Sequence, residues 1–272
     1  MEVQTDQRIA ALLNGFEKNQ PALSHVLNLA RFLSKAVVLL YSPELSPDDN
    51  AEKKLEALST EMTQKENYPI DFLLLKSKFK EEVKSLPESC GSVVLVLSSL
   101  ESYTSSTPEK ILKALSQARI PYIITQTALE HTNLYKRILL PIDSMKESKE
   151  KVLWASYFGR FNASFIQIFA GSYKDEYLRR QLQNNLKFIR KMLTNFEVEY
   201  DIDFHENKLN YDNAIIQFAQ EKQCGMLLIL AWPKGGLLGL ISKPRELKWL
   251  KTEQKIPVMF LNPREDLYVL CD

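Results

Sequence analysis

The chain has 272 residues, of which 45% are hydrophobic and 25% are charged, and its 35 basic residues nearly balance its 34 acidic ones. This length exceeds that of one typical compact domain, and the composition is that of an ordinary globular protein, so we expect two domains. A net charge this close to zero creates no field that draws the chain to nucleic acid or to an anionic membrane. Nucleic-acid and membrane partners are therefore not expected.

The amino-terminal residues lack a basic region followed by an apolar core, and no apolar run approaches the roughly 18 residues of a membrane span. These features predict a cytoplasmic location. The three cysteines, Cys90, Cys224 and Cys271, are odd in number and have no CxxC spacing. They indicate reduced thiols rather than a disulfide framework or a cysteine metal site.

An internal duplication organises the sequence. Segments of the first half recur about 130 positions later with the same apolar pattern, and the shift drifts slowly, as expected of one ancestral unit with loop insertions. The matched pairs are RIAALLN (8–14) with RILLPID (137–143), SVVLVLS (92–98) with GMLLILA (225–231), and IPYI (120–123) with IPVM (256–259).

In the first half, short apolar runs alternate with amphipathic stretches, which predicts strands alternating with helices. The expected strands are 8–14, 37–41, 70–75, 92–98 and 122–124, and the expected helices are 20–34, 49–65, 79–86 and 108–118.

The second half shows the same alternation. Its longest predicted helix carries Leu178, Leu182, Leu186, Ile189 and Leu193, spaced so that they share one apolar face. The expected strands are 137–143, 164–170, 197–202, 225–231 and 258–260, and the expected helices are 147–161, 175–194, 210–222 and 245–252.

Strands that alternate with such helices require right-handed parallel crossovers, so each half is predicted to be a doubly wound α/β domain. We place the domains at residues 1–130 and 131–272. The linker, residues 126–136, is short and mixed in composition, which indicates that the halves pack against each other. A ligand site in this architecture lies at the carboxyl ends of the strands.

Familiar catalytic motifs are absent from the sequence. It contains no GxSxG elbow, no GxxxxGK phosphate loop and no GxGxxG fingerprint. The three histidines, His25, His131 and His205, are far apart and lack metal-site spacing, so we interpret them as surface or capping residues.

The strand at 137–143 ends in a carboxylate at the edge of the predicted sheet. Asp143 or Ser144 can cap the following helix, with Glu147 at the acidic position of a capping box. Asp143 can equally bind a ribose hydroxyl, and both roles can hold together.

The loop that follows the fourth strand of the second half is rich in glycine. It contains Gly235, Gly236 and Gly239, whose backbone amides could cradle phosphate. Lys234, Lys243 and Arg245 add positive charge, and no acid precedes Glu246 in this segment. Alternatively the glycines only shape the loop, and the apolar segment 237–241 packs on a neighbouring domain.

A resemblance to a known family is carried by the order and spacing of five motifs, seen twice: RILLPID, the polar turn 144–148, Asn162-Ala163, MLLILA and Ile256-Pro257. In these motifs the sequence resembles the universal stress protein family in its tandem form. The resemblance covers nearly the whole chain. It implies the adenine nucleotide alpha hydrolase-like fold, with five-stranded parallel sheets in order 3-2-1-4-5 that associate through their fifth strands. The resulting internal pseudo-dimer could dimerise further, and one branch of the family binds ATP at the strand ends.

The phosphate clamp of that branch is incomplete here. Its three glycine positions fall on Ala231, Lys234 and Pro244, or, in a second register, the third falls on Trp249. The first half has Asn14 in place of Asp143, and its loop carries Glu101. The resemblance therefore implies a weak adenine-nucleotide site, for ATP or AMP, in the second half alone. Its residues would be Pro141, Asp143, Ser144, Phe169, Ala170, Ala231, Lys234, Gly235, Gly236 and Gly239, with adenine against the backbone of Phe169 and Ala170.

We interpret the chain as a non-enzymatic cytoplasmic stress-response protein or regulator that requires no cofactor and no metal. A protein-interaction module with an unknown protein partner is an alternative. A nucleotide hydrolase is a further one, which would need a metal carboxylate and a base; Asp143 is the only acid that the sequence places at the site. The apolar tail, residues 267–270, is expected to dock on its own protein.

Overall fold

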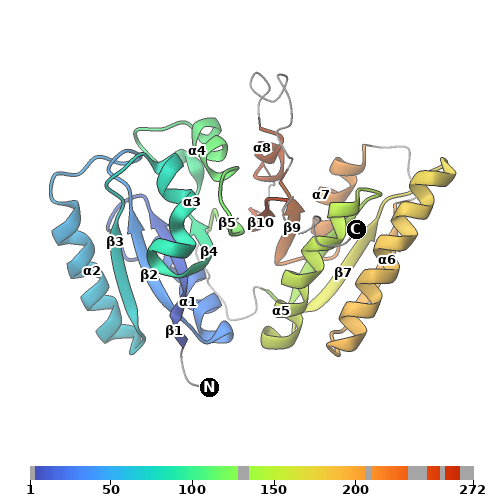
Figure 1. The fold of residues 1–272 in the computed structure, drawn as a ribbon, viewed down its shortest axis with the longest axis horizontal. Coiled ribbons are helices and arrows are strands. Elements are labelled where there is room, and N and C mark those ends of the chain that lie inside the picture. Colours follow the sequence, from blue (N-terminus) through green and yellow to red (C-terminus); the bar gives the residue numbers. More distant parts are fainter. Residues whose placement is uncertain (1–3, 128–134, 206–209, 232–243, 252–254, 264–272) are drawn as a thin grey trace.

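The computed structural model describes residues 4–127, 135–205, 210–231, 244–251 and 255–263. Helices and strands alternate along the chain. The strands form a single sheet, and the helices cover both of its faces (Figure 1). The elements of the first half are β1 (Gln4–Leu13), α1 (Pro21–Leu33), β2 (Lys35–Tyr41), α2 (Ala51–Glu66), β3 (Ile70–Leu74), α3 (Phe79–Cys90), β4 (Ser92–Leu97), the 3-10 helix η1 (Leu100–Ser102), α4 (Pro108–Leu115) and β5 (Tyr122–Ile124).

The second half repeats this order after the linker. Its elements are β6 (Arg137–Ile142), the 3-10 helix η2 (Lys146–Lys151), α5 (Val152–Asn162), β7 (Phe165–Ala170), α6 (Glu176–Asn195), β8 (Tyr200–Phe204), α7 (Tyr211–Glu221), β9 (Met226–Leu230), α8 (Glu246–Trp249) and β10 (Val258–Leu261).

The strand order is β3-β2-β1-β4-β5-β10-β9-β6-β7-β8, so each half has the expected order 3-2-1-4-5. Pairing is parallel within each half, whereas β5 and β10 pair antiparallel, with Met259 opposite Ile123. The expected association of the fifth strands is confirmed. It joins the two five-stranded sheets edge to edge into one ten-stranded sheet, because hydrogen bonding between the two edge strands continues the ladder.

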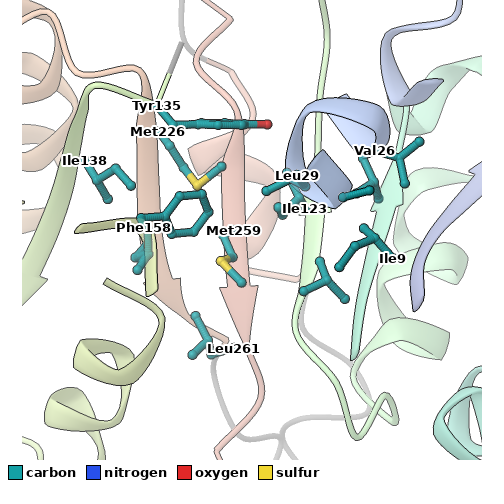
Figure 2. Close-up of a cluster of buried hydrophobic side chains, with 14 of the residues drawn as sticks. Ile9, Val26, Leu29, Ile123, Tyr135, Ile138, Phe158, Met226, Met259 and Leu261 are labelled. Atoms are coloured by element: carbon teal, nitrogen blue, oxygen red, sulfur yellow. The ribbon is translucent and has the colours of Figure 1, made fainter. Parts of the chain in front are cut away.

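Alternating strand residues send apolar side chains to the two faces of the sheet, as strand geometry requires. On one face, Ile9 and Leu13 pack under α1, α2, α5 and α6. On the other face, Ala10 and Leu12 pack under α3, α4, α7 and α8. Each core extends across both halves, and Figure 2 shows Ile9 and Val26 of the first half in the same cluster as Phe158 and Met259 of the second.

The halves pack directly on each other, as the short linker indicates. The ring centroids of Phe32 and Phe158 are 5.5 Å apart, and those of Tyr135 and Phe158 are 5.4 Å apart. Gln126, at the start of the linker, donates a side-chain hydrogen bond to the Leu250 carbonyl oxygen of the second half. Linker residues 128–134 lie outside the described residues.

Helix ends are where the sequence prediction was least accurate. A 3-10 helix precedes α5, which begins only at Val152, and neither Asp143 nor Ser144 caps it. The last predicted helix shortens to α8 with four residues, and β8 begins at Tyr200 because Glu197 turns the chain with a φ of 54°. On α6 the apolar face is confirmed from Leu182 onward.

Within the ranges described above, no helix combines the length and the apolarity needed to cross a bilayer.

Candidate ligand site at the strand carboxyl ends

A small cavity lies at the carboxyl ends of β6 and β9 in the second half. It has a volume of about 90 Å³ and is lined by Pro141 and Asp143 after β6, by Tyr211 on α7, and by Lys151 and Trp249. Pockets that hold drug-sized ligands span about 300 to 1,000 Å³. The cavity formed by the described residues is therefore too small for a whole nucleotide without rearrangement.

Lys151 extends under this cavity and is almost fully buried, at 4% exposure. Its Nζ donates to the Pro141 carbonyl oxygen at 2.6 Å and lies 3.4 Å from the Ser148 hydroxyl. Burial lowers the pKa of Lys151 to about 8, and the nearby Asp143 carboxylate opposes that shift. The Lys151 amine therefore hydrogen-bonds a carbonyl oxygen at the strand end that a ligand in the cavity could otherwise use.

Asp143 is held in a turn rather than at a helix cap. Its Oδ1 accepts from the Met145 backbone amide at 3.0 Å, an arrangement that competes with helix capping. Asn185 on α6 secures this turn by donating to the carbonyl oxygens of Asp143 at 3.0 Å and Met145 at 2.7 Å. The carboxylate is thereby positioned at the wall of the cavity, where a ribose hydroxyl could reach it.

Tyr211 closes the cavity on the side of β7. Its hydroxyl lies 2.6 Å from the Phe169 carbonyl oxygen and 3.0 Å from the Ile142 carbonyl oxygen. Its ring stacks on Phe169, with centroids 5.7 Å apart. Burial, reinforced by Asp143, raises the pKa of Tyr211 well above its usual value, so this hydroxyl remains a neutral donor.

Acids neutralise the basic side of the site. Asp212 on α7 forms ion pairs with Arg245, at 3.0 Å, and with Lys248. Glu246 also lines the cavity and is buried, at 6% exposure. Asp143 was the only acid that the sequence placed at the site; that expectation was wrong, because α7 and α8 bring Asp212 and Glu246 to the same cavity. Phosphate meets less positive potential here than the sequence indicates.

The structure brings some predicted site residues together and not others. Pro141 and Asp143 line the cavity, and the Ser144 amide donates to the Tyr173 hydroxyl at 3.2 Å. Ala231 is buried at the end of β9. The remaining loop residues of the prediction, Lys234, Gly235, Gly236 and Gly239, lie outside the described residues, as does the apolar segment 237–241.

The two positions expected to meet adenine are already hydrogen-bonded within the protein. The Phe169 carbonyl accepts from Tyr211, and the Ala170 carbonyl accepts from the His205 amide at 2.8 Å. The Phe169 ring lies between Tyr211 and Phe218, with a centroid distance of 4.3 Å to Phe218. An adenine ring would have to displace part of this cluster.

The interpretation of the histidines as surface or capping residues was wrong for two of them. His25 is completely buried, and His205 is buried beside Phe169 and Tyr211. His131 lies outside the described residues. Spacing along the sequence could not reveal this burial, because it comes from the packing of distant elements.

The strand ends of the first half are polar too, a feature that the sequence analysis missed. The Tyr103 hydroxyl donates to the Leu12 carbonyl at 2.8 Å, much as Tyr211 does in the second half. Three buried side-chain oxygens there lack a hydrogen-bond partner in the part of the chain that is described, namely those of Asn14, Ser42 and Ser46. Asn14 and Ser42 follow paired strands, so they lie at the same edge of the sheet.

No group of three or more histidine, cysteine or acidic side chains is arranged to hold a metal ion among the residues that the structure places. Cys90 and Cys224 are free thiols, and burial raises the pKa of Cys224 to about 11.

Two tandem doubly wound units, each in order 3-2-1-4-5 with its polar edge at the strand carboxyl ends, define the adenine nucleotide alpha hydrolase-like class of fold. Solved structures agree. A universal stress protein from Archaeoglobus fulgidus DSM 4304 aligns with a TM-score of 0.65 and 12% identity, covering 94% of this chain and 98% of that one. A structure described as a putative universal stress protein from Pseudomonas aeruginosa UCBPP-PA14 aligns with a TM-score of 0.63 and 14% identity, covering 96% and 94%. The chain therefore has the universal stress protein fold in its tandem, two-unit form.

The same fold occurs in a different setting. The cytoplasmic domain of a prokaryotic cation chloride cotransporter aligns with a TM-score of 0.55 and 12% identity, covering 96% of this chain and 95% of that one. No protein-family model matches the sequence, and comparison with curated proteins gives no match.

Proposed function

We propose that this protein is a non-catalytic cytoplasmic regulator of the universal stress protein type, active in the stress response, whose second half binds adenine nucleotide weakly. The observation that carries the proposal is the set of internal hydrogen bonds at the strand ends. Tyr211 and Lys151 donate to the carbonyl oxygens of Phe169, Ile142 and Pro141. A ligand must replace these bonds, so little of its interaction energy remains as affinity.

Electrostatics supports weak binding as well. Asp212 holds the cationic groups of Arg245 and Lys248, so a phosphate group would compete with a carboxylate for both. Asp143 remains at the cavity wall as the group suited to a ribose hydroxyl. The expected dissociation constant for ATP or AMP is about 0.1 to 1 mM, the range in which a few hydrogen bonds barely exceed the cost of association.

Titration calorimetry with ATP and AMP on the intact chain tests this proposal. Asp143→Ala should weaken binding, whereas Asn14→Ala, at the corresponding position of the first half, should leave it unchanged. Submicromolar affinity, two sites per chain, or full binding by Asp143→Ala would contradict the proposal. A phosphate-release assay with ATP and Mg²⁺ should show no turnover, and measurable release would favour the hydrolase alternative.

A protein-interaction module is a second candidate, favoured by exposed aromatic side chains at the carboxyl ends of α5 and α6. Phe161 and Phe196 are 38% and 36% exposed, and the Arg160 guanidinium lies over both rings, at 5.0 and 4.7 Å. Such aromatic and arginine clusters are typical of interface cores. Affinity capture with the wild-type chain and with Phe161→Ser/Phe196→Ser distinguishes the candidates, because a partner of this surface should be lost from the variant while nucleotide affinity is unchanged.

A further inference from the structure

A second and larger hollow lies between the two halves, beside the strand-end cavity: Leu261, which lines this hollow, pairs with Leu230, which lines the strand-end cavity. Its volume is about 380 Å³, which falls within the range of pockets that hold ligands. Both halves contribute apolar side chains to it: Val93, Ile120 and Pro121 from the first, and Leu153, Trp154 and Leu261 from the second. We call this hollow the inter-half groove.

The groove presents apolar surface to solvent. Leu153, at the start of α5, is 44% exposed, although it is a large hydrophobic residue. Trp154 is partly buried beside it, and its ring centroid lies 5.4 Å from that of Tyr157. A concave apolar surface of this kind usually has an occupant.

The described chain leaves β10 at the wall of this groove. Leu261 and Asn262 both line it, and the Asn262 side-chain amide donates to the carbonyl oxygens of Leu115, at 2.9 Å, and Ala118, at 2.8 Å. These two hydrogen bonds fix the point from which the last nine residues, 264–272, depart. Any segment that follows Pro263 therefore begins beside the groove.

Those nine residues match the groove in chemistry and in length. They contain the apolar run Leu267, Tyr268, Val269 and Leu270, with Glu265 and Asp266 before it. Leu267 lies four positions after Pro263, and four residue steps of chain span up to about 14 Å. The charged side chains that line the groove are mixed in sign, namely Arg119, which pairs with Glu88, and Glu150, so the match rests on apolar contact and on length.

We propose that the inter-half groove is the docking site of the chain's own carboxyl-terminal segment, with residues 267–270 covering Leu153 and Trp154. A short tether gives such a segment an effective concentration in the millimolar range, so it outcompetes a free apolar ligand of similar intrinsic affinity. The docked segment adds a further contact between the halves, on the side of α5, and its release uncovers an apolar surface formed by both. This inference does not depend on nucleotide binding.

Disulfide trapping in the full-length chain tests the proposal, because Cys271 follows the apolar run directly. The test chain carries Leu153→Cys together with Cys90→Ser, which leaves the buried Cys224 as the other native thiol. Mild oxidation in dilute solution should give a disulfide within one chain between position 153 and Cys271, identified by peptide mapping. The matched control is Tyr177→Cys in the same background, since Tyr177 is 68% exposed at the start of α6, on the outer side of α5 (Figure 1).

Trapping at position 153 should be about tenfold faster than at position 177, because docking raises the local thiol concentration only at the groove. Adding Leu267→Asp and Leu270→Asp to the Leu153→Cys chain should slow trapping by a similar factor of about ten if apolar contact, and not the tether alone, holds the segment. Equal rates at both positions, or no effect of the two aspartates, would overturn the proposal. Disulfides that form only between chains would also overturn it and would assign the groove to the tail of a second copy.

Discussion

His25 Nδ1 lies 2.5 Å from the hydroxyl of Tyr135, and the other ring nitrogen of His25 lies 3.1 Å from the Thr127 carbonyl oxygen. Thr127 and Tyr135 are the described residues on either side of linker positions 128–134. One buried side chain on α1 therefore holds both ends of the connection between the halves. The Thr127 carbonyl can only accept a hydrogen bond, so the neutral ring donates from Nε2 and accepts the Tyr135 proton at Nδ1.

The first prediction concerns pH. Burial lowers the pKa of His25 from 6.5 to about 4. Between these values the unfolded chain binds a proton that the folded chain does not, so the contribution of neutral His25 to stability is present above pH 6.5 and is lost as the pH falls toward 4. The stability difference between wild type and His25→Gln should therefore shrink by about 3 kcal/mol between pH 7 and pH 4, measured by urea unfolding.

Tyr135→Phe is the control for this prediction. It removes the hydroxyl but keeps the burial that is the main cause of the His25 shift, so its pH dependence should follow that of the wild type. A constant difference between wild type and His25→Gln across this pH range would show that the histidine does not titrate as expected.

The second prediction concerns the hydroxyl of Tyr211. Tyr211→Phe removes this donor from the buried Phe169 carbonyl oxygen, whereas the Ile142 carbonyl oxygen keeps its hydrogen bond from the Gly171 amide, at 2.8 Å. We expect the free energy of unfolding to fall by about 1 to 3 kcal/mol, the cost of a buried polar group that loses its partner. Tyr177→Phe removes an exposed hydroxyl and should change stability by less than about 0.5 kcal/mol. Similar effects of the two substitutions would mean that the strand-end hydrogen bonds contribute little.

The third prediction concerns the close approach of Gly159, on α5, to Val198. A Cβ added at Gly159 would lie 2.2 Å from Val198 Cγ1, a distance at which something must shift. Alanine normally favours a helix over glycine by about 1 kcal/mol, but overpacking of this kind costs about 1 to 3 kcal/mol. Gly159→Ala should therefore destabilise the protein in thermal or urea unfolding.

A double-mutant cycle checks the cause. Combined with Val198→Ala, which makes room, Gly159→Ala should become neutral or stabilising. At Gly15 an added Cβ would meet only the end of the Glu17 side chain, so Gly15→Ala should cost little. A penalty for Gly159→Ala that persists in the Val198→Ala background would exclude this contact as its source.

The fourth prediction rests on the proposed function and concerns the acid that neutralises the site. Asp212→Ala should release Arg245 and Lys248 from their ion pairs and raise the positive potential beside the cavity. We expect ATP to bind about three to ten times more tightly, since one charge a few ångströms away contributes about 1 kcal/mol at a partly solvated site. Asp203 on β8 forms an ion pair with Lys222, and Asp203→Ala should leave the affinity for ATP unchanged. Titration calorimetry decides, and unchanged affinity in Asp212→Ala would place the phosphate elsewhere.

The sequence by itself determined the duplication, the alternation of strands and helices, and the pairing of β5 with β10. The duplication and the alternation follow from local apolar periodicity, which can be read from neighbouring residues, whereas the pairing of β5 with β10 is what the resemblance to the universal stress protein family implied. The RILLPID segment correctly located Pro141 and Asp143 at a strand end. The universal stress protein fold could therefore be expected from the sequence.

Only the tertiary structure decided what surrounds those strand ends. Tyr211 and Asp212 begin α7, far along the chain from β6, and packing brings them over the carbonyl oxygens and cations that a nucleotide would use. His25 gave no spacing signal, yet its ring holds both ends of the linker. Burial and hydrogen bonding of such groups depend on which side chains from distant parts of the sequence come into contact. The apolar periodicity of a single segment does not indicate those contacts.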